Sequence, residues 1–268
     1  NWHLEPQDLW LIYIPKGEID ITNYPAIEAH LLPFKNQLER RATKQAWFEL
    51  QQPQAAYRED FSGKKIIYPE FSRQSAYLDE RGYFINNKIF YLKGGFFELG
   101  LFNSNAMWFL IKGLAPIVIG GSRELRAQYI ETLPIPTANE TQRAEIAQLA
   151  EACQRAAEAR RDCQAAFRHR ITDLAALGAV KLNTKLNNWW LLDFAAFRAE
   201  VKKQFKQDIP LAERNDWEAY FNQQRDLVQN ATQQITQHEA ALNRLVYALF
   251  SLSKDEIFQL YVNQIYLG

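Results

Sequence analysis

The residue types that most often bind metals or act as nucleophiles are few in this sequence and widely spaced. The histidines are His3, His30, His169 and His238, and the cysteines are Cys153 and Cys163. Neither set has the short spacing of a metal site, and two cysteines cannot supply a four-ligand zinc centre. We therefore predict no metal site, and we interpret His30 and His238 as surface or packed side chains.

One carboxylate lies close in sequence to two lysines, as it would in a hydrolytic centre. Glu70 follows Pro69, and Lys64 and Lys65 come shortly before it. A magnesium-dependent nuclease needs further carboxylates to hold the metal, and no second one is well placed. The glycine motifs that cradle phosphates are absent as well. A nuclease centred on Glu70 is the alternative that we rank last.

Basic residues interleaved with aromatic residues give the better binding signal. Residues 35–73 hold eight Lys and Arg against five Asp and Glu, with Trp47, Phe48, Tyr57 and Tyr68 among them. Cations neutralise phosphates, and aromatic rings stack on bases. The predicted phosphate contacts are Lys35, Arg40, Arg41, Lys44, Lys64 and Lys65. A solvated charged surface over an aromatic core has the same pattern, and this alternative stays open.

Two predicted loops carry side chains suited to reading base edges. Arginine can donate two hydrogen bonds to guanine, and glutamine can pair with adenine in the same two-bond manner. One loop follows a predicted strand at residues 65–71, and the other follows the pair Gly120-Gly121. The predicted base contacts are Arg73, Gln74, Ser75, Arg123 and Arg126. An ordinary pair of polar loops is the competing interpretation.

The first half of the chain mixes short strands with short helices. Aromatic or β-branched runs bounded by turn residues predict strands at residues 9–14, 65–71, 83–92 and 116–119. One helix is predicted to begin at Pro25, where a proline costs no hydrogen bond, and to bend at Pro33. A second helical segment is predicted over residues 99–113. Two prolines within residues 133–136 end this half.

The second half has a helical pattern. Thr137 and Glu140 fit a capping box at its start. Apolar positions then recur in steps of three and four, once over residues 146–167 and again over residues 217–249. Such heptad seams predict two long helices that pack on each other as an antiparallel coiled-coil pair. A shorter helix is predicted over residues 194–205, and Ser253 with Glu256 predicts a last one.

Composition narrows the class of protein. The chain has 268 residues, of which 47% are hydrophobic, and 31 Lys and Arg balance 31 Asp and Glu. A disordered chain and a histone-like polycation are both excluded. No apolar run has the length of a membrane span, so we expect no membrane and a cytoplasmic protein. The sequence begins without Met, and we expect it to be part of a longer chain.

The order of several short motifs resembles a known family. Residues 24–31 read YPAIEAHL, residues 47–53 read WFELQQP, and residues 65–69 read KIIYP. Residues 101–104 read LFNS, and residues 133–136 read LPIP. This ordered set resembles the C-terminal specificity (target-recognition) domain of TaqI-like and Eco57I-like type IIG restriction–modification proteins. Residues 239–257 resemble the closing element of such proteins, except that Phe250-Ser251 stands where Tyr-Gly is usual.

The resemblance implies the fold and the partners. We expect an α+β protein, with a mixed target-recognition domain over residues 1–138 and a helical domain carrying the coiled-coil pair over residues 139–268. The partner is double-stranded DNA, read on behalf of an N-terminal adenine methyltransferase that uses AdoMet, with Mg²⁺ if an endonuclease is fused. The methyltransferase motif Asn-Pro-Pro-Tyr is absent from these residues. We therefore expect this segment to choose the site without being an enzyme and without a cofactor of its own.

Two other functions compete with this interpretation. The coiled coil could be the functional part, as a scaffold that binds a partner protein. Alternatively, the chain could be a separate specificity subunit that acts with a methyltransferase on another chain.

Overall fold

The chain folds into two units that differ in size. The computed structural model describes residues 2–5, 9–53, 55–175 and 181–266. The larger unit consists of Asn1–Leu4, Ile66–Leu78 and Asn87–Gly268, and the smaller one of Glu5–Lys65 and Asp79–Asn86. Two of the four boundaries between the units fall within strands, namely β1 (Lys65–Pro69) and β3 (Tyr77–Asp79).

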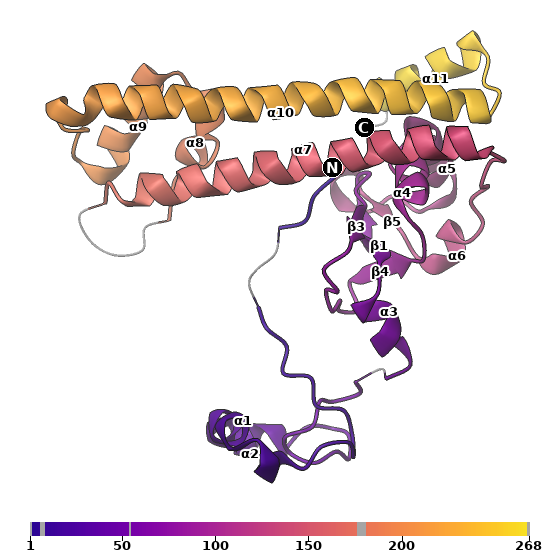
Figure 1. Ribbon diagram of the computed structural model, residues 1–268, viewed down its shortest axis with the longest axis vertical. Helices are drawn as coiled ribbons and strands as arrows, with labels where there is room; N and C mark the ends of the chain where they lie inside the picture. Colours follow the sequence, from indigo (N-terminus) through magenta and orange to yellow (C-terminus); the bar gives the residue numbers. More distant parts are fainter. Residues whose placement is uncertain (1, 6–8, 54, 176–180, 267–268) are drawn as a thin grey trace. The chain divides into compact units, whose positions relative to one another are not determined.

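Two long helices, α7 (Glu140–Thr172) and α10 (Arg214–Leu249), lie side by side in the larger unit (Figure 1). The Sγ atom of Cys153 approaches the carbonyl of Ile235, whereas that of Cys163 approaches Gln224. Residue numbers therefore rise along one helix as they fall along the other, which confirms the antiparallel pair. The predicted seam positions are buried or half-buried along both helices.

The start of α7 differs from the predicted capping box. Asn139 is the N-cap, and its side chain accepts a hydrogen bond from the N–H of Gln142 at 2.9 Å. The Gln142 side chain accepts one in return from the N–H of Asn139 at 3.0 Å. The prediction of Thr137 and Glu140 was wrong by two residues because Asn139 offers an equally good capping oxygen closer to the helix.

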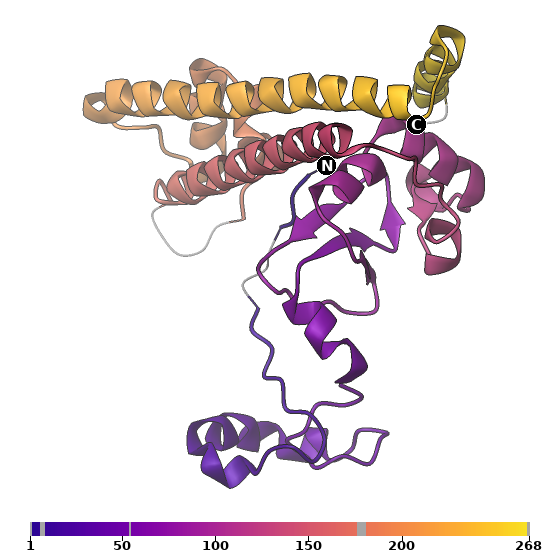
Figure 2. The ribbon, with the colours of Figure 1, turned by 45° about the vertical axis from the view of Figure 1, so that its right-hand side comes forward.

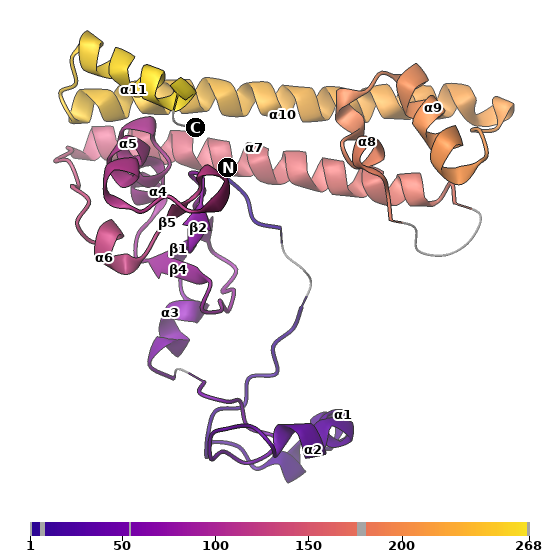
Figure 3. The same cartoon turned by 180° about the vertical axis from the view of Figure 1, so that it is seen from behind.

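A helical cap covers one end of this pair, and a short helix follows the other end. The cap consists of α8 (Thr184–Asn187), the 3-10 helix η5 (Trp189–Leu191) and α9 (Phe194–Phe205), and η6 (Leu211–Glu213) leads into α10. Its core is aromatic, with Phe167, Trp189, Phe197 and Phe221 fully buried. Figure 2 shows α11 (Lys254–Tyr266) turned away from the end of α10, and Figure 3 shows α8 and α9 at the opposite end. The predicted helix over residues 194–205 is confirmed.

Ser251 forms the turn between α10 and α11 in a conformation that favours glycine. Its φ is +53°, and the N–H of Leu252 donates to the carbonyl of Tyr247 at 3.0 Å while the N–H of Ser251 donates to that of Ala248 at 3.1 Å. These two bonds define a Schellman cap, whose left-handed residue is usually glycine. The serine therefore keeps the turn at a cost in backbone strain.

Replacing Ser251 with glycine should therefore stabilise the chain. We expect a gain of about 0.5–1 kcal/mol, because the strain removed exceeds the added freedom of the unfolded chain. Thermal unfolding followed by circular dichroism should show a midpoint about 1–4 °C higher. Ser251→Ala is the control, since alanine retains the strain. An equal gain from alanine would contradict the assigned cause.

Small antiparallel sheets accompany the helices. Strands β1 and β3 join β4 (Ile89–Leu92) in the order β3-β1-β4, with Ile66 opposite Leu92 and Pro69 opposite Ile89. A second ladder pairs β2 (Phe71–Ser72) with β5 (Arg123–Glu124). The predicted strand at residues 65–71 is largely confirmed. The strand predicted at residues 83–92 is confined to β4, and residues 116–119 contribute only the bridge of Ile117 to Arg123.

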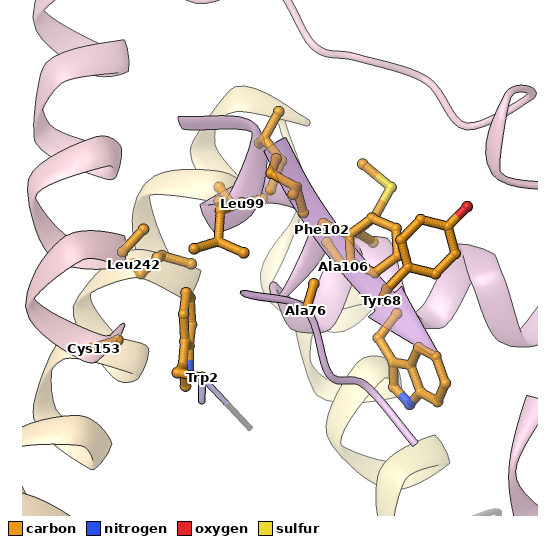
Figure 4. Packing of buried hydrophobic residues seen from close by; sticks show 14 of the residues in the cluster. Trp2, Tyr68, Ala76, Leu99, Phe102, Ala106, Cys153 and Leu242 are labelled. Atoms are coloured by element: carbon orange, nitrogen blue, oxygen red, sulfur yellow. The ribbon is translucent and has the colours of Figure 1, made fainter. Parts of the chain in front are cut away.

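The predicted helical segment at residues 99–113 consists of two helices. These are α4 (Phe96–Phe102) and α5 (Asn105–Leu114), and the 3-10 helix η4 (Ile119–Gly121) and α6 (Ala127–Ile130) follow them. Ser104 separates α4 from α5, and its Oγ accepts a hydrogen bond from the N–H of Met107 as the cap of α5. Figure 4 shows part of the hydrophobic core of the larger unit. Leu99 of α4, Cys153 of α7 and Leu242 of α10 contribute side chains to it.

The observed division of the chain differs from the predicted boundary between residues 138 and 139. Helix α4 packs on α7, and the side chain of Gln154 on α7 bonds the main chain of Leu78. Residues 66–78 and 87–138 therefore fold together with the helical segment. The change in composition at residue 138 marks a change of secondary structure within one unit. Residues 176–180 and 267–268 of the predicted helical domain lie outside the described residues.

The smaller unit consists of short helices and loops. Its helices are η1 (Ile21–Asn23), α1 (Pro25–Leu31), η2 (Leu32–Phe34), α2 (Lys35–Leu38), η3 (Ala55–Tyr57) and α3 (Arg58–Ser62). The start at Pro25 and the interruption at Pro33 are confirmed. The predicted strand at residues 9–14 is wrong, because Leu9 and Trp10 are exposed and none of the described strands pairs with them. The Glu49 carboxylate organises this unit by accepting the N–H groups of Gly17 and Ala46.

Candidate nucleic-acid interface

The β2–β5 ladder brings together the two loops that the sequence marked as base-reading. Phe71 lies opposite Glu124, and Ser72 lies opposite Arg123. The guanidinium of Arg73 donates to the carbonyl of Gly120, so the side chain crosses the turn that precedes β5. Gly120 and Gly121 have φ of +76° and +75°, and these values explain why glycines occupy this turn.

Exposed side chains gather on one side of this ladder. Phe71 is 47% exposed, Ser72 is buried and Arg73 is exposed, as expected for alternate residues of a strand. The Lys88 ammonium lies 5.7 Å from the centre of the Phe71 ring. The exposed Arg126 pairs with Glu124 at 2.6 Å. We call Phe71, Arg73, Lys88 and Arg126 the β2–β5 face.

Arg123 does not belong to this face, which corrects one predicted base contact. Its side chain is buried, and its Nη1 donates to the carbonyl of Ala115 at 3.1 Å. The guanidinium therefore supports the loop from inside.

Gln74 and Ser75 are half-buried beside the face. Gln74 has a φ of +78°, and its Nε2 donates to the carbonyl of Asn103 at 2.6 Å. The Gln74 side chain therefore contributes to the shape of its loop. Its base contact and that of Ser75 stay predictions.

Sequence reasoning missed Phe71, which the β2–β5 ladder positions, and Lys88, which the antiparallel pairing of β1 with β4 positions. Because Pro69 lies opposite Ile89, the next residues along, Glu70 and Lys88, become neighbours. The N–H of Glu70 donates to the carbonyl of Lys88, and their side chains form an ion pair at 2.7 Å. Lys88 lies eighteen residues along the chain from Glu70, so no local sequence pattern indicated that the two residues pair.

The predicted phosphate contacts lie in the smaller unit and differ in availability. Arg40 and Lys44 are exposed, and neither forms an ion pair with another described residue. Lys35 is partly exposed beside Glu39 and lies 5.3 Å from the Trp47 ring. These cations suit phosphate contacts, because such contacts need a long charged side chain and carry no sequence information themselves.

Two more of the predicted phosphate contacts already have protein partners. Arg41 is half-buried and donates to the carbonyls of Leu38 and Trp47, each at 2.8 Å. Lys64 is exposed and pairs with Glu80 at 2.9 Å. A phosphate would have to compete with these groups for the cations.

The prediction of Lys65 as a phosphate contact was wrong, because its side chain is only 1% exposed. Its Nζ lies 2.5 Å from Oδ2 of Asp79, which is also buried. The same carboxylate accepts the N–H groups of Arg81 and Tyr83, each at 2.8 Å. Lys65 therefore stabilises the smaller unit and is removed from the predicted phosphate contacts.

The described residues contain no cluster of three or more His, Cys, Asp or Glu side chains that could hold a metal ion. Glu70 is paired with Lys88, and Lys65 is bound to Asp79, so this carboxylate and this lysine of the nuclease alternative have other partners.

Burial raises the pKa of Cys153 to about 12, which leaves its thiol protonated at neutral pH. No helix in the described ranges is both long and apolar enough to cross a membrane.

Comparison with known proteins adds one match. A family model described as a domain of unknown function (DUF8810) matches residues 139–246. The matched segment begins at the N-cap of α7 and ends near the C-terminus of α10, so it contains the antiparallel pair and its helical cap. No curated protein matches the chain.

Proposed function

We propose that this chain recognises a specific sequence in double-stranded DNA, as the target-recognition part of a restriction–modification protein. In this proposal the β2–β5 face reads base edges through Arg73 and Arg126. Exposed cations of the smaller unit, above all Arg40 and Lys44, contact phosphates. The AdoMet-dependent adenine methyltransferase, and any Mg²⁺-dependent endonuclease, would be modules outside these residues.

One observation supports the proposal most strongly. Two loops that are far apart in sequence were each predicted to read bases, and a two-residue ladder joins them on one surface. That surface offers guanidinium groups of the kind that read guanine, next to an exposed aromatic ring. An enzyme that flips a base out of the duplex also needs a domain that holds the duplex in register.

The scaffold alternative is weaker because the seam of the coiled coil is already occupied. The apolar positions of α7 face those of α10 within the chain, including Val228, Ile235 and Leu242. A partner helix would have to use another surface. The separate-subunit alternative concerns only which chain carries the methyltransferase, and it shares the same DNA surface.

Selection from a randomised duplex pool at about 0.15 M salt tests the proposal. The chain should enrich one short motif, and Arg73→Ala and Arg126→Ala should each relax one position of it. Loss of a two-bond base contact costs about 1–3 kcal/mol, or about 5- to 150-fold in affinity for the selected site. Arg40→Ala and Lys44→Ala should instead weaken binding to all sequences and lower the salt slope by about 0.9 each.

Arg244→Ala is the matched control, since Arg244 is exposed on α10 far along the chain from both loops. It should leave the motif unchanged. If the folded chain binds no duplex, the proposal fails and a scaffold function is favoured. Binding without any enriched motif would contradict the reading role of the β2–β5 face.

A further inference from the structure

The segment that leads from the base-reading loop into β3 lies at a sheet edge. The order β3-β1-β4 leaves β3 with a strand on one side only. The N–H and C=O groups on its other side need partners, because an open edge invites pairing with another chain. Two side-chain amides supply these partners.

Each amide makes the pair of hydrogen bonds that a neighbouring strand would make. The N–H of Ala76 donates to Oδ1 of Asn103, and Nδ2 of Asn103 donates to the carbonyl of Ala76, both at 3.0 Å. Two residues later, the N–H of Leu78 donates to Oε1 of Gln154 at 2.8 Å, and Nε2 of Gln154 donates back to its carbonyl at 2.9 Å. Both amide side chains are buried.

Asn103 also fixes the loop itself. Its main-chain carbonyl accepts Nε2 of Gln74, the residue with φ of +78° directly after Arg73. The loop is therefore held by the β2–β5 ladder before Arg73 and by Asn103 after it. A residue other than glycine stays in this conformation only where its surroundings enforce it.

One amide directly follows a helix of the larger unit, and the other lies on a helix of this unit. Asn103 follows α4, and the N–H of Asn105 donates to Oδ1 of Asn243 on α10 at 2.8 Å. Gln154 lies on α7, where nearby Glu158 accepts the hydroxyl of Tyr77 at 2.6 Å. The position of the loop is thus set by α4, α7 and α10 together.

We propose that Asn103 and Gln154 are positioning residues for base reading, so that the helix pair is the frame which holds Arg73 and Gln74 in their reading geometry. This inference rests on the proposed function. It gives the antiparallel pair a specific role in DNA recognition, in addition to its contribution to stability.

Gln154→Met tests the inference, because methionine keeps the length of the side chain and removes both hydrogen bonds. Hydrogen exchange should become about 5- to 150-fold faster at residues 73–78, the range expected when buried main-chain groups lose their partners. In the duplex selection, the variant should relax the position that Arg73→Ala relaxes, with an unchanged salt slope. Gln154→Glu, which keeps the acceptor for the N–H of Leu78, should partly restore both readouts.

Gln148→Met is the matched control, since Gln148 is exposed on the same helix. It should change neither exchange nor base preference. Faster exchange with the wild-type base preference would mean that Gln154 protects the sheet edge only, and would overturn the inference. Unchanged exchange in Gln154→Met would overturn it as well. Absence of any selected motif with the wild-type chain would instead overturn the proposed function.

Discussion

Replacement of Lys65 by methionine should lower the free energy of unfolding by about 3–5 kcal/mol, the cost typical of removing one partner from a buried ion pair. The ammonium of Lys65 and the carboxylate of Asp79 are both excluded from water, at 2.5 Å from each other. Without Lys65, the Asp79 charge keeps, among the described residues, the N–H groups of Arg81 and Tyr83 as its partners. Urea unfolding followed by circular dichroism measures the loss as a lower midpoint.

Lys64→Met is the matched control, because the adjacent lysine makes the same kind of pair at the surface. Lys64 and Glu80 are 2.9 Å apart but about half exposed, so their pair should contribute less than about 1 kcal/mol. The double variant Lys65→Met, Asp79→Asn should recover much of the loss, since no buried charge is left unpaired. Equal losses for Lys64→Met and Lys65→Met would contradict the buried position of Lys65.

These two lysines illustrate a limit of sequence reasoning. Lys64 and Lys65 are neighbours of the same residue type, and the charge pattern placed both at phosphates. The sheet separates them, because β1 begins at Lys65, next to Asp79 on the adjacent strand β3, whereas Lys64 precedes the strand and stays at the surface. Burial of Lys65 depends on a pairing between strands that no local pattern specified.

The helical half was more predictable because its pattern is local and repeated. Steps of three and four recur over many turns, so a seam survives errors at single positions. In the first half of the chain, short apolar runs indicated strands without indicating which strands would pair. Residues 9–14 pair with no strand among the described residues, whereas β2 and β5 pair over only two residues each. The convergence of Arg73 with the Gly120-Gly121 turn follows from that short ladder, and it could not be derived from the sequence.

The second large effect should come from Gly100, where α4 meets the helix pair. A Cβ at this position would lie 2.8 Å from Cγ2 of Ile146 and 3.3 Å from both the Cβ of Ala150 and Cδ1 of Leu242. We expect Gly100→Leu to lower the free energy of unfolding by about 3 kcal/mol, the upper part of the range for overpacked cores. Urea unfolding measures it.

Gly113→Leu separates packing from helix propensity, since Gly113 lies in the last turn of α5 and a Cβ there meets nothing within 4 Å. This control should gain up to about 1 kcal/mol, because leucine favours a helix over glycine. Because α4 ends directly before Asn103, Gly100→Leu should also displace that amide and speed hydrogen exchange at residues 73–76. Gly113→Leu should not. If Gly100→Leu were as stable as Gly113→Leu, α4 could not pack on α7 as closely as described, and the helix pair could not hold the loop of residues 73–75 through Asn103.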